Sequence, residues 1–77
     1  MAEPKVTLDV RTIVPAQKHV RIHAEFDALQ PGEAMILVND HDPKPLYYEM
    51  RAERPGTFEW TYLEQGPAVW RIHLQRV

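Results

Sequence analysis

The most constraining feature of the sequence is an unbroken apolar run, Ala34–Val38, in the middle of the chain. Five consecutive apolar residues suit a strand that is covered on both faces, because a strand with one wet face would alternate apolar and polar residues. The run therefore predicts a central strand of a β-sheet. A chain of 77 residues has room for one small domain, so the other elements should pack around this strand.

Three other segments alternate apolar and polar residues in the period-two pattern of a strand with one buried face. They cover residues 6–10, 58–63 and 70–75. The turn residues Gly66-Pro67 lie between the last two segments, which predicts a β-hairpin. On the last strand His73 alternates with the apolar positions, so we expect its ring to face solvent.

Helix start and stop signals separate these strands. Pro15 suits the first turn of a helix, where its missing N–H needs no partner, and residues 30–32 contain the Pro-Gly pair that would stop that helix. A second helix is predicted over residues 43–53. The order is β-α-β-α-β-β, with the first two strands parallel and both helices on one face of a four-stranded mixed sheet. We therefore predict an α+β fold, a two-layer α/β sandwich over residues 5–76.

The composition excludes several classes of function. The chain has no cysteine and no serine, which removes disulfides, thiolate ligands and the Ser- or Cys-based nucleophilic mechanisms. A net charge of -2 gives no basic surface for nucleic acid, and Trp60, Tyr62 and Trp70 are typical of core or cross-strand pairs. No apolar run approaches the roughly 20 residues of a membrane span, and no signal peptide is evident. We expect a cytoplasmic protein that is not an enzyme and binds neither nucleic acid nor membrane.

Parallel pairing of the first two strands would bring both helix N-termini to one edge of the sheet, where open α/β sheets usually have their sites. His19 lies one turn into the first helix, and His41 lies between two acids before the second. One Asp would be enough to cap that helix, so the second acid favours a functional role for His41. The candidate residues for binding a ligand or partner are His19, Asp40, His41, Asp42, Pro43 and Pro45.

We expect no cofactor, although the same region could bind a transition metal. His19 and His23 have the i, i+4 spacing that lets two imidazoles share an ion, and His41 with its neighbouring acids could add ligands. The metal ligands predicted on this basis are His19 and His41, with His23 as a third candidate. The specific HExxH motif is absent. The alternative is that His19 and His23 simply border the core, each with one hydrogen-bonded nitrogen.

Several segments also resemble a known family, and the most specific of them is Leu37–Leu46, with its Asn-Asp-His-Asp-Pro-Lys-Pro-Leu sequence. The others are His19, Phe26–Leu29, Pro31–Glu33, Glu53–Trp60 and Gly66–Trp70. Over residues 8–76 the chain is similar to the domain-of-unknown-function family 2249, within the TusA/SirA-like superfamily of small sulfur carriers. The resemblance implies the same β-α-β-α-β-β order.

The resemblance implies a change of chemistry as well. Sulfur carriers use a Cys before a Pro at the start of the first helix, whereas Val14 precedes Pro15 here. We therefore expect no sulfur transfer and interpret the chain as a non-catalytic binding or adaptor module. The family's association with hemerythrin-like domains implies a hemerythrin-like or redox protein as partner. The alternative function is transition-metal or haem-iron binding linked to redox or nitric oxide physiology.

Overall fold

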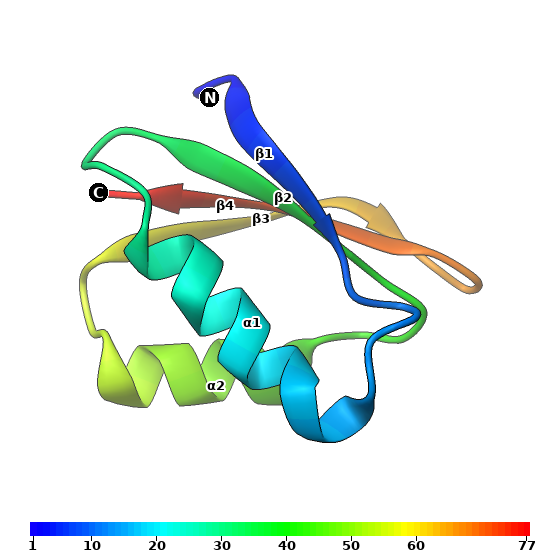
Figure 1. The fold of residues 1–77 in the computed structure, drawn as a ribbon. Coiled ribbons are helices and arrows are strands. Elements are labelled where there is room, and N and C mark those ends of the chain that lie inside the picture. The colour runs from blue at the N-terminus through cyan, green and yellow to red at the C-terminus, as the bar shows by residue number, and fades with distance from the viewer.

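The computed structural model describes residues 1–77 and contains four strands and two helices (Figure 1). In chain order these are β1 (Pro4–Asp9), α1 (Pro15–Asp27), β2 (Ala34–Asn39), α2 (Lys44–Glu53), β3 (Phe58–Gln65) and β4 (Trp70–Arg76). The predicted α+β class and the order β-α-β-α-β-β are confirmed. Neither helix is both long and apolar enough to cross a membrane.

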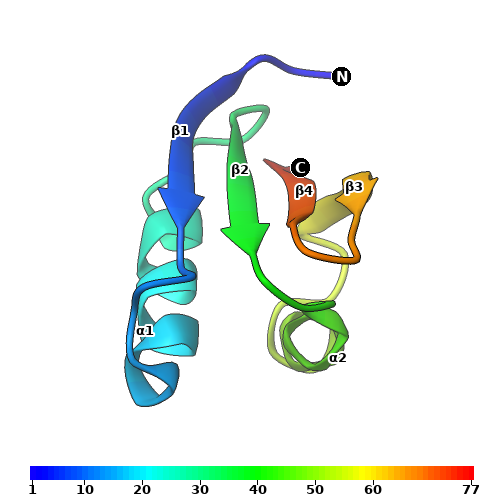
Figure 2. The same cartoon turned by 90° about the vertical axis from the view of Figure 1, so that its right-hand side faces the viewer.

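The four strands form one mixed sheet in the order β1-β2-β4-β3. β2 pairs in parallel with β1, and β4 pairs antiparallel with both β2 and β3. All six residues of β2 are buried, as the apolar run Ala34–Val38 predicts. Both helices cover the same face of the sheet, with α1 beside β1 and α2 beside β3 (Figure 2).

Each helix contributes a short apolar stripe to the core. Ile22 and Phe26 of α1 and Leu46 and Met50 of α2 are at most 2% exposed, and they pack against the inner face of β2 and β4. Pro15 is the first residue of α1, where its missing N–H leaves no helical hydrogen bond unmade. Because these apolar residues must be buried, they determine which face of each helix packs against the sheet and which side faces the other helix.

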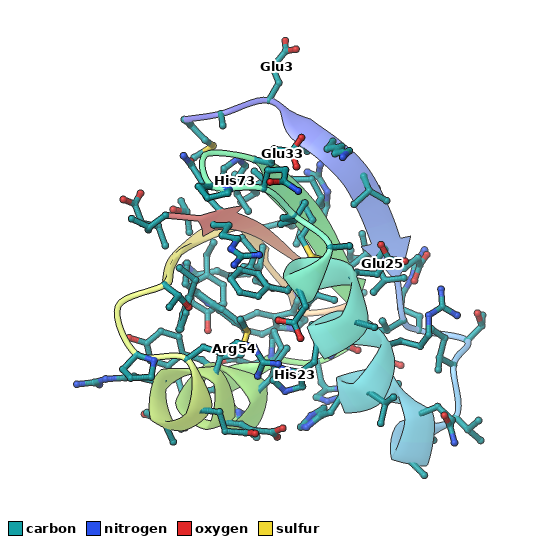
Figure 3. All side chains as sticks on the ribbon, turned by 60° about the vertical axis from the view of Figure 1, so that its left-hand side comes forward. Glu3, His23, Glu25, Glu33, Arg54 and His73 are labelled. Carbon is teal, nitrogen blue, oxygen red and sulfur yellow. The ribbon has the colours of Figure 1, made fainter.

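The prediction that His73 faces solvent is wrong. Its side chain points to the face opposite the helices, but the residue is only 3% exposed because the N-terminal segment covers it (Figure 3). His73 Nε2 donates a hydrogen bond to the carbonyl oxygen of Ala2 at 2.6 Å. A carbonyl has no proton to give, so this contact fixes the tautomer with Nε2 protonated.

Candidate functional site

The connections that follow β1 and β2 meet at one end of the sheet (Figure 1), as parallel pairing predicts. The carboxylate of Asp40 lies near the positive charges of Lys18 on α1 and Arg11 after β1. The hydrogen bond with His41, followed by the charge of Lys18, holds the pKa of Asp40 below its ordinary value. Asp40 is therefore a carboxylate at neutral pH and links the two connections electrostatically.

His41 and His19 have different partners in the structure. His41 Nδ1 lies 2.7 Å from Asp40 Oδ1, and its side chain is 62% exposed. His19 Nδ1 lies 2.6 Å from Glu49 Oε2 on α2. Asp40 precedes His41, and Lys18 precedes His19. Because the charges of Asp40 and Lys18 interact, the segments that carry the two histidines lie close together. Ligation of a common metal by His19 and His41 stays a prediction.

Asp42 contacts β3 and does not cap α2. The carboxylate of Asp42 accepts a hydrogen bond from the Tyr62 hydroxyl at 2.8 Å, while α2 begins after Pro43 with no side-chain cap. Capping of α2 by one acid of this turn, the alternative to a functional role, is therefore wrong, because α2 has no side-chain cap. Burial, followed by the bond to Asp42, raises the pKa of Tyr62, and the neighbouring Trp60 partly opposes this. Tyr62 is consequently a neutral donor over the physiological range.

Beside this contact lies a groove of about 270 Å³ between α2 and β3. It is lined by Lys44, Tyr47, Tyr48, Trp60 and Tyr62. The rings of Tyr47 and Trp60 meet edge to face with centroids 5.3 Å apart, and Trp60 meets Tyr62 in the same way at 6.2 Å. Pro43, which immediately precedes α2, is buried. Pro45 lies in the first turn of α2, just before Tyr47, and is exposed.

The groove has hydrogen-bond donors that lack partners. The indole nitrogen of Trp60 is buried and makes no hydrogen bond, and the exposed Lys44 makes no ion pair within the chain. The neighbouring Asp42 already accepts a hydrogen bond from Tyr62. The groove therefore offers flat apolar walls together with an ammonium, which suits a planar group that carries negative charge.

A second cluster lies between the two helices. Glu49 of α2 accepts from His19 Nδ1 through Oε2 at 2.6 Å and from His23 Nε2 through Oε1 at 2.8 Å. His23, Glu49 and Glu53 each offer one ligand atom, and these atoms lie within 4.8 Å of one another. The bonds to His23 and then His19 hold the pKa of Glu49 below its ordinary value, although burial acts in the opposite direction.

Sequence reasoning missed both Glu49 and the groove. It treated the strand aromatics as core or cross-strand pairs, and it sought partners for His19 among the acids around His41. A signal for the groove was present in the consecutive Tyr47-Tyr48, because adjacent helical residues cannot both face the core. A signal for Glu49 was its position beside the apolar stripe Leu46–Met50, in a helix expected to lie next to α1.

These features define a two-layer α+β protein with an aromatic surface groove, an inter-helix His/Glu cluster and no serine or cysteine nucleophile. Residues 7–76 match the family model described as an uncharacterized conserved protein (DUF2249), so the chain belongs to that family. This confirms the family resemblance in the sequence, while the wider TusA/SirA-like superfamily stays a prediction. No curated protein and no solved structure matches the chain.

Proposed function

We propose that the protein is a non-catalytic binding module whose binding site is the aromatic groove between α2 and β3. The observation that carries this proposal is the set of four aromatic side chains around one groove. The Asp42–Tyr62 hydrogen bond ties the groove to the Asp-His-Asp turn that the sequence singled out. In this proposal Asp42 and Pro43 hold the wall of the groove in place, and the aromatic rings contact the ligand.

The chemistry of the groove favours a planar anion. Edge-to-face and stacked contacts between rings contribute about 0.5–1.5 kcal/mol per pair, so a flat ligand gains from each wall. Lys44 at the groove and the N-terminal end of α2 both favour negative charge. An aromatic carboxylate combines these properties.

The proposal includes three further features predicted from the sequence, namely the superfamily, the type of partner and the location in the cell. We infer a TusA-like fold in which the position of the sulfur-carrying Cys is taken by Val14, and in which the site has moved to the groove beside α2. The planar anion could be a group on a partner protein, of the redox or hemerythrin-like type that the family resemblance implies. Tyr48, which is 57% exposed at the groove, would be within reach of such a partner. A cytoplasmic location is part of the same proposal.

Two-dimensional NMR of the indole N–H groups tests the proposal directly. The chain has two tryptophans, so Trp60 gives one of two indole signals, and Trp70 gives the internal reference. Benzoate and indole-3-carboxylate should shift the Trp60 signal in a saturable titration. Benzylamine, which has the opposite charge, and cyclohexanecarboxylate, which is not flat, should shift it at least several-fold less at equal concentration.

Two variants control for the location of binding. Tyr48→Ala removes one exposed wall of the groove and should weaken binding of indole-3-carboxylate at least several-fold. Val20→Ala removes an equally exposed apolar side chain of α1 and should leave binding unchanged. Absence of any shift at Trp60, or equal shifts in wild-type protein and Tyr48→Ala, would contradict the proposed function.

A further inference from the structure

Two pairs of metal-ligating side chains face each other across the contact between the helices. His19 and His23 lie one turn apart on α1, and Glu49 and Glu53 lie one turn apart on α2. Figure 3 shows His23 pointing from α1 into the space between the helices, where Arg54 also lies. The four side chains come from regular helices whose relative position is fixed by the core, so the cluster does not depend on the exposed connections.

The spacing of the ligand atoms is close to what a metal requires. The imidazole nitrogens lie 2.6 Å and 2.8 Å from the two oxygens of Glu49, and an oxygen of Glu53 lies within 4.8 Å of the ligand atoms of His23 and Glu49. In a tetrahedral site, bonds of about 2.0–2.2 Å place neighbouring ligand atoms roughly 3.4 Å apart. His23 and Glu49 would move apart by less than about 1 Å on binding, whereas His19 contacts only Glu49 and lies outside this group of ligand atoms.

The charges around the cluster also favour a cation. Glu49 and Glu53 contribute two negative charges, and the nearby guanidinium of Arg54 is already held by Asp27 through bonds of 3.0 Å and 2.8 Å. Glu49 makes hydrogen bonds only with the two imidazoles and Glu53 makes no ion pair, and the charge of Arg54, which is bonded to Asp27, also acts on both carboxylates. A divalent ion would balance these two carboxylates.

We propose that His23, Glu49 and Glu53 form a site for a divalent first-row transition metal between α1 and α2, beside His19, which contacts Glu49 and would have to move toward the ion to join them. Imidazole and carboxylate donors suit zinc, cobalt, nickel or iron, and the absence of cysteine excludes a thiolate site. This site shares no residue with the aromatic groove, so it stands or falls independently of the proposed binding function. It also replaces His41 with Glu49 as the partner of His19.

The tautomers of the two imidazoles set the expected affinity. Each ring nitrogen at Glu49 carries a proton in the metal-free protein, because the carboxylate can only accept. On metal binding that proton must move to the other ring nitrogen or be released. His19 is half exposed and can pass it toward solvent, whereas Nδ1 of His23 is buried without a partner. We therefore expect binding weaker than at a typical structural zinc site.

The test uses the full chain without an affinity tag, treated with a chelator and then titrated with Zn²⁺ by calorimetry and with Co²⁺ by visible absorption. We expect one equivalent to bind and Co²⁺ to give the visible bands of a low-symmetry nitrogen and oxygen site. Glu49→Gln keeps the shape of the side chain and should weaken binding at least tenfold. Glu53→Gln changes an exposed residue and should weaken it several-fold without affecting the fold.

His41→Gln is the matched control, because His41 forms an equivalent contact with Asp40 outside the cluster. It should leave the affinity and the Co²⁺ spectrum unchanged. Absence of binding to wild-type protein would overturn the proposal and leave His19 and His23 as inter-helix hydrogen-bond donors. Binding that survives in both Glu49→Gln and Glu53→Gln would also overturn it, and binding lost in His41→Gln would place the metal at His19 and His41 instead.

Discussion

Substitution of Gly66 by alanine should destabilise the protein through the ring of Trp70. Gly66 ends the β3 side of the hairpin with φ of +65°, and its N–H donates to the carbonyl of Val69 at 2.8 Å. A Cβ at this position would lie 2.8 Å from both Cε2 and Nε1 of Trp70. Carbon atoms do not approach so closely, so the indole or the turn must shift.

The expected magnitude has two parts. A residue with a Cβ in the left-handed region costs about 1–2 kcal/mol relative to glycine. Relieving the clash with Trp70 adds roughly 1–3 kcal/mol, by analogy with overpacked cores, and the lower end applies because the indole is half-buried and can move outward. Gly56→Ala supplies the matched control: its φ is +71°, but nothing lies within 4 Å of the position of its Cβ.

Urea unfolding followed by circular dichroism gives the free energy of unfolding of both variants. Effects of alanine on the unfolded chain are common to the two substitutions and cancel in the difference. Gly66→Ala should be less stable than Gly56→Ala by about 1 kcal/mol or more, which corresponds to a melting temperature lower by about 4–8 °C. If Gly66→Ala is no less stable than Gly56→Ala, the clash with Trp70 does not contribute and the reasoning is refuted.

Three further substitutions test other contacts. Tyr62→Phe removes the hydrogen bond to Asp42 and should lower the free energy of unfolding by about 1 kcal/mol in urea titrations, and an unchanged value would mean that the bond contributes nothing. Arg54 holds the pKa of Asp27 below its ordinary value, so this pair stabilises the fold above the unfolded pKa and the contribution disappears as pH falls through the folded pKa. The melting temperature of Asp27→Asn should therefore be lower than that of wild-type protein near pH 7, and the two should converge at acidic pH. A difference in melting temperature that does not change with pH would contradict this reasoning. Ile22→Val, at a site 2% exposed, should cost about 0.5–1.5 kcal/mol, and a neutral result would show a loosely packed core.

Most of the fold follows from signals that are local in the sequence. The run Ala34–Val38 is buried in the middle of the sheet because an apolar residue at every position can only be accommodated by a strand covered on both faces. Pro15 and the residues around Pro43 mark helix starts, where the fixed φ and missing N–H of proline are tolerated. These effects act within a few residues and do not depend on where distant segments pack.

The partners of polar side chains follow from contacts between distant segments, which explains the errors. His73 alternates with apolar residues, but whether its face is wet depends on the path of the N-terminal segment about seventy residues earlier in the chain. One acid of the Asp-His-Asp turn was an alternative candidate for the cap of α2, but α2 has no side-chain cap and Asp42 accepts a hydrogen bond from Tyr62 on β3. In both cases the partner lies on a distant segment, which the local sequence pattern does not indicate.

The geometry of α2 accounts for both candidate sites at once. Its buried stripe, Leu46 and Met50, is bordered on one side by Glu49 and Glu53 and on the other by Tyr47. The acidic border faces α1, whose own stripe is bordered by His19 and His23, so the inter-helix cluster forms when the two stripes pack on the same sheet. The aromatic border faces the edge strand β3, where Trp60 and Tyr62 complete the groove. A ten-residue helix that lies between a second helix and a strand therefore presents two chemically different surfaces, and substitutions on one border should leave binding at the other unchanged.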